Sequence, residues 1–364
     1  MKVGILGGGQ LGRMLALAGY PLGFSFRIFD PAADACAGQV VADHVIAEFD
    51  DEAALVRFAT GLDVITYEWE NVPVGAVRFL ERLAPVYPPV EALETAQDRL
   101  LEKTLFRKLG IATAAFASVG STADVRRAVT DIGLPSVLKT RRGGYDGKGQ
   151  AVLHSPSEAD AAWAEMCAAP LILEGFVPFG RELSVIGVRG LDGRVALYPL
   201  VENKHREGIL RVSRAPAPDV GEALQSQAHD IITAVLETTG YVGILAIELF
   251  EDDGRLLANE MAPRVHNSGH WTIEGAETSQ FENHLRAICG LTLGSIETRG
   301  HSAMVNLIGA VPDSDAVLAI AGTHLHLYGK EPRAGRKLGH VTVRANDAPA
   351  IEISLTKLGR LIEN

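Results

Sequence analysis

The sequence predicts two kinds of fold unit, an α/β unit followed by an α+β region, with a small β-rich module at the end. Three observations lead to this division. Strand and helix patterns alternate over residues 1–89, short strands separated by glycine-rich turns occupy residues 96–300, and a strand-leaning tail follows. We therefore expect domains at residues 1–95, 96–300 and 301–364.

The first unit consists of three strand-helix pairs. Short apolar runs alternate with stretches of helical periodicity, which is typical of a small parallel sheet covered by helices. A proline-rich linker, YPPVEALETAQD, follows, and Thr95 and Asp98 have the spacing of a capping box, which predicts a helix that Gly110 ends. The six elements expected before the linker are residues 2–6, 9–19, 24–29, 51–60, 63–66 and 75–84.

The first turn contains Gly7, Gly9 and Gly12, a G-x-G-x-x-G sequence directly after a strand, and the second strand ends at Asp30. This pattern matches the fingerprint of nicotinamide-dinucleotide enzymes. The glycines alone, however, indicate only a sharp turn into a helix whose free N–H groups attract an anion. Any phosphate would fit such a turn, and a bare tight turn is the alternative.

Composition excludes several classes of function. The 364 residues exceed what one core usually fills, and 47% hydrophobic and 22% charged residues are typical of an ordinary folded protein. The net charge of −11 disfavours nucleic acid and membrane surfaces as partners. Cys36, Cys167 and Cys289 are far apart, which fits a reducing compartment and predicts no disulfide framework. Because no run approaches the length of a membrane span, we expect a cytoplasmic protein.

The most informative segment is the loop after a strand that ends at Lys139. Residues 143–149 contain four glycines beside cations, but Arg142 and Gly149 stand where a P-loop requires glycine and Ser or Thr. A strand-end lysine followed by flexible backbone N–H groups predicts a lid over a triphosphate. The alternative is a glycine-rich hairpin with a solvated charge run.

Two further carboxylates lie where a nucleotide would need them. Glu174 ends an apolar strand that continues into Gly175, Phe176 and Val177, where a carboxylate and free backbone groups can read an adenine edge. Glu182 lies on the next strand and is placed to accept ribose hydroxyls. Taken singly, each glutamate also fits the role of a residue that ends or solvates a strand.

A hairpin, GILAIELFEDDGRLLANEMAPR, carries two more carboxylates. If residues 252–254 form its loop, Glu248 and Glu260 lie diagonally on one face, whereas a two-residue loop would place them on opposite faces. An unpaired carboxylate in the apolar run around Glu248 would be costly, so we expect Mg²⁺ between the two glutamates, where it would bridge nucleotide phosphates. The alternative is a salt bridge from Glu248 to Arg264 or Lys139.

In this order, the strand-end lysine, the glycine loop, the strand glutamates and the carboxylate hairpin resemble the ATP-grasp ligases. Within that superfamily the sequence is similar to the N5-carboxyaminoimidazole ribonucleotide synthetases of purine biosynthesis. The similar segments are GGGQLGRM, YEWENVP, GGYDGKGQ, EGFVPFGRELSV, ENKHREGIL and NEMAPRVHNSGHWT, so the resemblance covers nearly the whole chain. It implies an N-terminal Rossmann-like (pre-ATP-grasp) domain, a central ATP-grasp domain and a small C-terminal β-rich module.

The resemblance also implies the residues of the nucleotide site. Lys139, Tyr145, Asp146 and Lys148 are expected to be catalytic, and Glu248 and Glu260 are expected to bind Mg²⁺ or Mn²⁺. The residues expected to bind ATP are Arg99, Lys139, Gly144, Tyr145, Asp146, Gly147, Lys148, Gly149, Gln150, Glu174, Gly175, Phe176, Val177, Glu182, His205, Asn259 and Glu260.

The substrate implied by the resemblance is aminoimidazole ribonucleotide. GGGQLG would bind its 5′-phosphate at a helix N-terminus, and the basic turn at residues 329–337 would reach it from the other side, unless that turn is simply a solvated loop. The residues expected to bind the substrate are Gly9, Gln10, Leu11, Glu68, His266, Asn267, Ser268, Lys330, Arg336 and Lys337.

The implied reaction carboxylates this ribonucleotide with ATP and bicarbonate. Bicarbonate would attack the γ-phosphoryl group to give carboxyphosphate and ADP, with Lys139 stabilising the anionic transition state. The 5-amino group would then take the carboxyl group, directly or through released CO₂, and phosphate would leave. The resemblance further implies a homodimer.

Two departures from the usual pattern of these relatives are visible. Ala262 stands where the superfamily commonly has an asparagine, so only two carboxylate ligands are expected, and Lys148 replaces an arginine, which loses the bidentate fork. Three other functions stay open: an NAD-dependent oxidoreductase, an ATP-grasp enzyme with another substrate such as a formate-dependent transformylase or an amino-acid ligase, and a non-catalytic ATP sensor.

Overall fold

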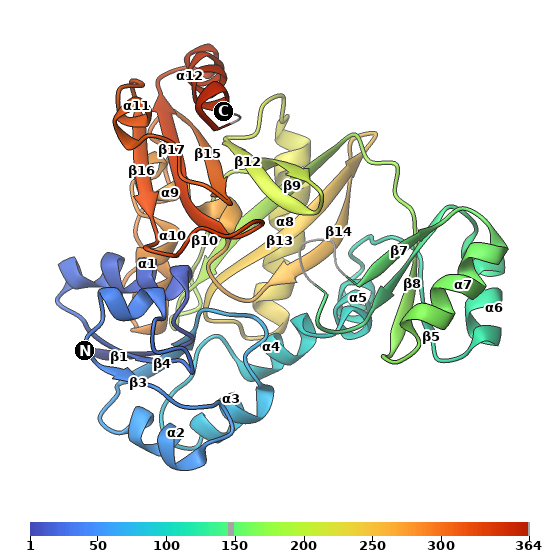
Figure 1. The fold of residues 1–364 in the computed structure, drawn as a ribbon, viewed down its shortest axis with the longest axis horizontal. Helices are drawn as coiled ribbons and strands as arrows, with labels where there is room; N and C mark the ends of the chain where they lie inside the picture. The colour runs from blue at the N-terminus through green and yellow to red at the C-terminus, as the bar shows by residue number, and fades with distance from the viewer. Residues whose placement is uncertain (145–148, 363–364) are drawn as a thin grey trace.

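The computed structural model describes residues 1–144 and 149–362, and the described residues form three β-sheets (Figure 1). The N-terminal sheet is parallel, with the strand order β3-β2-β1-β4. Its unit consists of β1 (Lys2–Leu6), α1 (Gln10–Gly19), β2 (Ser25–Phe29), β3 (His44–Val45), α2 (Glu52–Ala59), β4 (Val64–Tyr67), α3 (Val74–Leu80) and α4 (Val90–Ala96), with short 3₁₀ turns at Tyr20–Leu22 and Cys36–Gln39. The predicted α/β unit is confirmed, and the two-residue strand β3 is an addition to it.

A second sheet is antiparallel and has the order β5-β8-β6-β7. Helices α6 and α7 pack against each other and against this sheet, away from the rest of the molecule (Figure 1). The elements are α5 (Arg99–Lys108), β5 (Phe116–Val119), α6 (Thr122–Ile132), β6 (Ser136–Thr140), β7 (Gln150–Leu153), α7 (Pro156–Met166) and β8 (Leu171–Gly175). Lys139 therefore lies near the end of β6, as the sequence predicts.

The largest sheet has nine strands among the described residues, in the order β14-β13-β9-β11-β12-β15-β17-β16 with β10 beside β9. Because β15 pairs with β12, the strands of the C-terminal module extend the central sheet instead of forming a separate one. The elements are β9 (Arg181–Arg189), β10 (Val195–Leu197), β11 (Val201–Arg206), β12 (Ile209–Ala215), α8 (Glu222–Thr238), β13 (Gly243–Asp252), β14 (Arg255–Ala262), η3 (Asn267–Gly269), α9 (Thr272–Gly275), α10 (Gln280–Ile288), β15 (His301–Ile308), α11 (Ser314–Leu318), β16 (Thr323–Leu327), β17 (Lys337–Ala345) and α12 (Ala348–Ile362).

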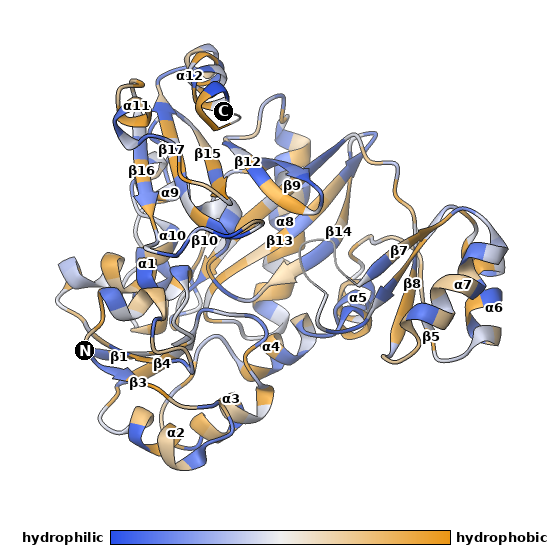
Figure 2. Cartoon of the chain, viewed as in Figure 1, coloured by the Kyte–Doolittle hydropathy of each residue, from blue (hydrophilic) through white to orange (hydrophobic). Residues whose placement is uncertain are grey.

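Strand β13 shows why the central sheet is stable. Ile244, Leu245 and Ile247 are fully buried, so both faces of the strand are covered, and Figure 2 shows β13 as largely orange. Helix α8 and the N-terminal unit supply the apolar groups on the two sides, in separate core clusters. Burial on both faces makes a charged side chain on this strand costly unless it has a partner.

The helix after the linker begins at a different cap from the one predicted. Asp98 is the N-cap of α5, because its side chain accepts a hydrogen bond from the Leu100 N–H at 3.0 Å, whereas the Thr95 hydroxyl donates to Glu91 O. The predicted capping box is therefore wrong by one turn. Asp98 also accepts two hydrogen bonds from the Arg141 guanidinium, at 2.9 and 2.7 Å, which fixes the root of the glycine loop to α5.

A buried histidine joins the N-terminal unit to the central sheet. His284 of α10 accepts a hydrogen bond at Nδ1 from the Ile244 N–H, at 3.1 Å, so its ring proton lies on Nε2, which is 2.8 Å from Thr66 Oγ1 on β4. Gly243 is required beside it, because a Cβ there would lie 2.9 Å from the imidazole. Burial lowers the pKa of His284 from its ordinary 6.5 to about 3.

We expect His284→Ala to lower the free energy of unfolding by about 2–4 kcal/mol near pH 7.5, because a buried N–H and a hydroxyl lose their partner. The pH dependence has a definite sign. Because the pKa of His284 is lower in the folded protein than in the unfolded chain, the unfolded chain binds the proton first as the pH falls. The contribution of His284 to the free energy of unfolding is therefore full above pH 6.5 and decreases as the pH falls towards 3. The variant lacks this component.

Urea unfolding at several pH values between 7.5 and 4.5 measures both effects. The matched control is His324→Ala, which removes an exposed histidine and should follow the wild-type profile. Parallel profiles for wild type and His284→Ala would contradict the assignment.

Candidate active site

A cavity of about 740 Å³ is lined by residues from the second and the central sheet, from α1 and α5, and from the segment after β4. It brings together side chains that are up to 327 residues apart in the sequence, Gln10 and Lys337. The residues predicted from the sequence that line it are Gln10, Leu11, Glu68, Arg99, Lys139, Gly144, Gln150, Glu182, His205, Glu248, Asn259, Glu260, His266, Asn267 and Lys337.

Other predicted site residues do not line this cavity. Those within the described residues are Gly9, Gly149, Glu174, Gly175, Phe176, Val177, Ser268, Lys330 and Arg336. Tyr145, Asp146, Gly147 and Lys148 lie outside the described residues.

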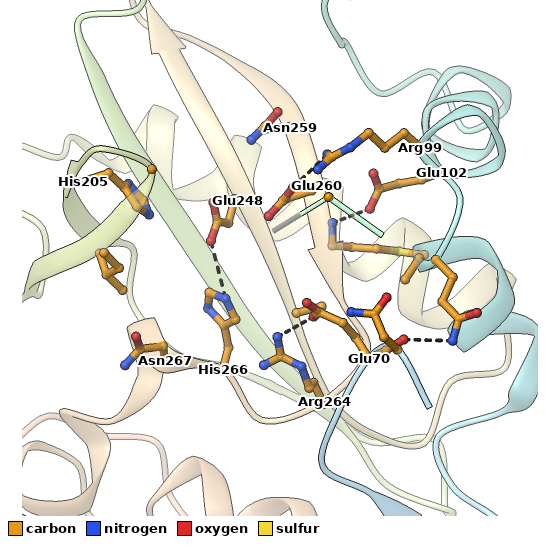
Figure 3. Close-up of a pocket in the computed structure, with 18 of the residues that line it drawn as sticks. Glu70, Arg99, Glu102, His205, Glu248, Asn259, Glu260, Arg264, His266 and Asn267 are labelled. Carbon is orange, nitrogen blue, oxygen red and sulfur yellow. Dashed lines mark hydrogen bonds and ion pairs between the residues drawn. The ribbon is translucent and has the colours of Figure 1, made fainter. Parts of the chain in front are cut away.

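Glu248 and Glu260 lie directly opposite each other on β13 and β14 (Figure 3). The hairpin loop has only two residues, Asp253 and Gly254, both with positive φ, which corrects the expected three-residue loop. With that loop alone the two glutamates would lie on opposite faces. A β-bulge next to Glu248 shifts the register by one residue and returns Glu260 to the same face.

The two carboxylates differ in their electrostatic environment. Burial and then the neighbouring Glu260 raise the pKa of Glu248 to about 8. Removal from bulk water also raises the pKa of Glu260, but the Arg99 guanidinium, 3.1 Å away, lowers it further, and the net pKa is below its ordinary value. One carboxylate is therefore balanced by an arginine, and no arginine or lysine of the described residues pairs with the other.

Neither of the alternative partners expected for Glu248 binds it. The Arg264 guanidinium pairs with Glu70 (Figure 3). Lys139 Nζ lies 2.9 Å from Glu174 Oε2. The group near Glu248 is instead His266, whose Nε2 is 3.4 Å from its Oε1. Burial, followed by the charge of Arg264, holds the pKa of His266 well below its ordinary value, so this imidazole is neutral and does not neutralise the carboxylate.

The oxygen atoms at this position fit a divalent cation. Two carboxylates face each other, and the buried Asn259 Oδ1 has no hydrogen-bond partner in the described structure. Carboxylate and amide oxygens are the ligands that Mg²⁺ and Mn²⁺ prefer. Within residues 1–144 and 149–362, no group of three or more His, Cys, Asp or Glu residues could hold a metal ion, so further ligands would have to come from a bound molecule such as a nucleotide.

Helix α5 contributes three charged residues that the sequence did not reveal as a group. Besides Arg99, Glu102 Oε1 accepts a hydrogen bond from the Met261 N–H at 2.6 Å, and Lys103 Nζ donates to Ala258 O at 3.3 Å. Burial and the nearby Glu260 raise the pKa of Glu102 to about 8. These residues hold β14 in place, but in the sequence they have the appearance of the solvated face of an amphipathic helix.

Glu174 is buried between two lysines. Its Oε2 lies 2.9 Å from Lys139 Nζ and 3.6 Å from Lys103 Nζ, and the residue is only 2% exposed. Burial raises its pKa, but the two lysines lower it more, so it stays ionised. Glu174 Oε1 is buried without a hydrogen-bond partner in the described structure, which leaves one acceptor available.

A second polar pair lines the cavity on β9 and β11. His205 Nδ1 lies 2.8 Å from Glu182 Oε2. Burial lowers the pKa of His205, but the hydrogen bond to Glu182 and the charge of Glu248 raise it above its ordinary value overall. Beside this pair, Phe179 and Phe250 stack with a centroid separation of 4.5 Å and form an apolar wall.

The helix N-terminus at GGGQLG already binds an anion, the carboxylate of Glu68. Its two oxygens accept hydrogen bonds from the Gly9 N–H at 3.0 Å and the Gly12 N–H at 3.2 Å. A Cβ on Gly9 would lie 2.7 Å from this carboxylate, so glycine makes room for it. Asp30 accepts from the Gly8 N–H at 2.7 Å. In this structure the N–H groups of the turn therefore donate to carboxylates of the protein itself, whereas the fingerprint suggests a bound phosphate or dinucleotide.

The basic turn contacts the N-terminal unit. The Lys330 ammonium donates to the Gln10 amide oxygen, and Gly329 O accepts from Gln39 Nε2 at 2.8 Å. Arg336 Nη1 donates to Glu331 O at 3.2 Å, which folds the turn on itself. Only Lys337, among the predicted basic residues of this turn, lines the cavity.

Three family models match the chain. They are the ribonucleotide synthetase preATP-grasp domain over residues 1–97, the ATP-grasp domain over residues 104–281, and the phosphoribosylaminoimidazole carboxylase C-terminal domain over residues 302–354. The chain is also 53% identical over 363 residues to the N5-carboxyaminoimidazole ribonucleotide synthase of Pseudomonas aeruginosa, and the match covers all of both chains.

The chain belongs to the N5-carboxyaminoimidazole ribonucleotide synthase family. Solved structures agree with this membership. The synthetase of Thermus thermophilus superposes with a TM-score of 0.96 at 57% identity, covering 100% of this chain and 99% of that one. The Aspergillus clavatus synthase in complex with ADP and 5-aminoimidazole ribonucleotide gives a TM-score of 0.91 at 33% identity, covering 100% and 97%. The resemblance inferred from the motifs and the ATP-grasp fold class are confirmed.

Among the helices of residues 1–144 and 149–362, none is both long and apolar enough to cross a bilayer.

Glu68→Gln tests the role of the carboxylate at the N-terminus of α1. The amide removes a negative charge and directs an NH₂ group at a backbone N–H, so we expect the free energy of unfolding to fall by about 1–3 kcal/mol. Urea unfolding measures this change. Asp34→Asn, an exposed acid in the same unit, is the matched control and should be neutral. A loss no larger than that of the control would show that Glu68 does not anchor the turn.

Proposed function

We propose that this chain is an ATP-grasp ligase that uses ATP and bicarbonate to convert 5-aminoimidazole ribonucleotide into N5-carboxyaminoimidazole ribonucleotide in purine biosynthesis. The observation that carries the proposal is one cavity in which the carboxylate pair of the ATP-grasp hairpin and the N-terminal unit meet, in a chain of this family. The relative that was solved with ADP and 5-aminoimidazole ribonucleotide supports both ligands.

We propose that ATP occupies the part of the cavity between the second sheet and the hairpin. Lys139 and Arg99 supply positive charge there, and the Glu182–His205 pair supplies acceptors and donors for a ribose. We propose that the unpaired Glu174 Oε1 and the backbone of Gly175, Phe176 and Val177 bind the edge of the adenine ring. Gly144, Gly149 and Gln150 border the loop that would cover the phosphates.

We infer that Glu248 and Glu260 would hold Mg²⁺, or Mn²⁺, with Asn259 beside them. When bound, such an ion supplies positive charge to phosphate oxygens. Arg99 keeps Glu260 ionised and fixes its orientation, and His266, which is neutral, leaves Glu248 free to act as a ligand. Lys139 offers a further charge where the γ-phosphoryl group would lie, held in place by Glu174.

The proposed reaction has two steps. A bicarbonate oxygen attacks the γ-phosphorus, the bond to the β-phosphate oxygen breaks, and carboxyphosphate and ADP form. The 5-amino nitrogen then forms a bond to the carboxyl carbon, directly or through released CO₂, while phosphate leaves and the amine loses a proton. Enclosure in the cavity protects carboxyphosphate from water.

We propose that the ribonucleotide binds between the N-terminal unit and the 264–270 segment. Gly9, Gln10, Leu11 and Glu68 would border its ribose phosphate, with His266, Asn267 and Ser268 opposite, and with Lys330, Arg336 and Lys337 in the basic turn above. We also propose that Tyr145, Asp146 and Lys148, with His266 and Asn267 opposite them, handle bicarbonate and the amine proton.

The proposal is tested by measuring ADP and phosphate release with Mg-ATP and bicarbonate, with and without 5-aminoimidazole ribonucleotide. Strong stimulation by the ribonucleotide, with one ADP and one phosphate per product, is the expected result. ATP binding without any stimulation would contradict the substrate and leave only the ATP-grasp architecture.

Glu260→Ala is expected to abolish ADP release, because one of the two proposed metal ligands and the partner of Arg99 are lost. The protein is expected to stay folded. The expected fall in kcat/KM is at least about 100-fold. Glu251→Ala on the same hairpin is the matched control, since it also breaks an ion pair with an arginine, Arg181, but does not line the cavity. Near-normal turnover of Glu260→Ala would show that the metal assignment is wrong.

We further infer that the chain acts as a cytoplasmic homodimer. The basis of this proposal is the resemblance of the sequence motifs to the synthetases and the wide spacing of Cys36, Cys167 and Cys289. Sedimentation equilibrium should give twice the mass of the chain, and a monomeric mass would contradict the dimer.

A further inference from the structure

Three polar side chains form a row across the C-terminal strands. Asn306 on β15 lies directly opposite His340 on β17, and His340 lies directly opposite His326 on β16. Because residues opposite each other in antiparallel strands point to the same face, the three side chains share one face of the sheet. His326 and His340 stack with a centroid separation of 4.4 Å and an interplanar angle of 9°, in agreement with this register.

A second row faces the first. It belongs to the helical segment formed by η3 and α9, in which positions three and four residues apart lie on the same side. The facing contacts are Asn267 with Asn306, His270 with His340, and Glu274 with His326.

The three contacts differ in kind. Asn267 and Asn306 exchange two hydrogen bonds, at 3.1 and 2.8 Å, and thereby fix the orientation of each other's amide. His270 and His340 touch through their rings, with centroids 4.8 Å apart. At the outer end, His326 Nε2 lies 2.7 Å from Glu274 Oε1. The polar row therefore leads from the cavity, which Asn267 and His270 line, towards the surface.

Asn306 itself does not line the cavity, but it holds two segments that do. Its Nδ2 donates to Leu210 O at 2.9 Å as well as to Asn267 Oδ1, and both Leu210 and Asn267 line the cavity wall. Asn306 is only 3% exposed. In an apolar strand such a buried amide is costly unless every group is paired, and here its donors and its acceptor all have partners.

We propose that Asn306 is a positioning residue for the ribonucleotide side of the cavity, because it fixes the orientation of the Asn267 amide. The C-terminal module thus acts on substrate binding through a side chain that never touches the substrate. This inference rests on the proposed function, because it needs a ribonucleotide bound next to Asn267.

The test compares Michaelis constants for the ribonucleotide and for ATP in Asn306→Asp and Asn306→Ala. The aspartate keeps the shape and removes both donors. The alanine avoids a buried charge, so the test stays available where the aspartate variant does not fold. We expect the KM for the ribonucleotide to rise about three- to tenfold, the size of one lost hydrogen bond, and the KM for ATP to change by less than about twofold.

The matched control is Asn283→Asp. Asn283 is also a fully buried asparagine whose Nδ2 bridges two groups, Tyr198 Oη and Gly294 O, but it does not line the cavity. It should lose stability to a similar degree and keep both Michaelis constants. Equal rises in both constants for the Asn306 variants, or the same ribonucleotide effect in Asn283→Asp, would overturn the proposal and show a purely structural role.

A double variant separates orientation from other effects. If Asn306 acts through Asn267, Asn267→Ala combined with Asn306→Ala should have the ribonucleotide KM of Asn267→Ala alone. Additive increases would overturn the proposal. Assays of the wild-type protein distinguish failure of the proposed function from failure of this inference. If the proposed function is wrong, the ribonucleotide does not stimulate ADP release by the wild-type protein.

Discussion

The central constraint in this structure is the presence of two carboxylates, Glu248 and Glu260, face to face on a hairpin whose neighbouring residues Ile247, Leu249 and Met261 are buried and apolar. Two negative charges on directly opposite residues are tolerated only when cations or protons compensate them. Arg99 compensates one of the two, and burial raises the pKa of the other to about 8. The proposed divalent cation would complete the balance, and the free Asn259 Oδ1 beside the pair is a further oxygen donor.

Much of the surrounding structure serves to hold this pair. Helix α5 supplies Arg99, and Glu102 and Lys103 bind the backbone of β14 on either side of Glu260. Asp98 caps the same helix and binds Arg141 at the root of the glycine loop. A single helix therefore connects the hairpin to Arg141, which follows β6 of the second sheet.

The sequence predicts the parts of the fold that depend on local patterns. Hydrophobic periodicity predicts the parallel N-terminal unit and β6, β8, β9 and β13, because in each of these elements the pattern extends over the whole strand or helix. The short strand β3 depends on its pairing with β2, which no local pattern contains. The cap at Asp98 is a local hydrogen bond from the Leu100 N–H, and the spacing of Thr95 and Asp98 pointed to the wrong one of these two residues. The continuation of the central sheet into β15 likewise depends on a long-range pairing.

The candidate site shows the same limit. The shared face of Glu248 and Glu260 was predicted from a loop length that is wrong, and it is restored by a β-bulge that leaves no mark in the sequence. The glycine fingerprint gives a sharp turn, but its anion is the carboxylate of Glu68, which is 56 residues after Gly12. Lys103 and Asn306 could not be recognised, since both act through partners more than 35 residues away.

The most direct test of the carboxylate pair is to measure ATP affinity by calorimetry with Mg²⁺ present and with all divalent cations removed by chelation. If the facing glutamates form a metal site that is completed by the nucleotide, removal of the cation should weaken ATP binding by at least about tenfold, which is about 1.4 kcal/mol. Equal affinity under both conditions would contradict the account, because the hairpin would then bind the nucleotide without the ion that the two carboxylates require.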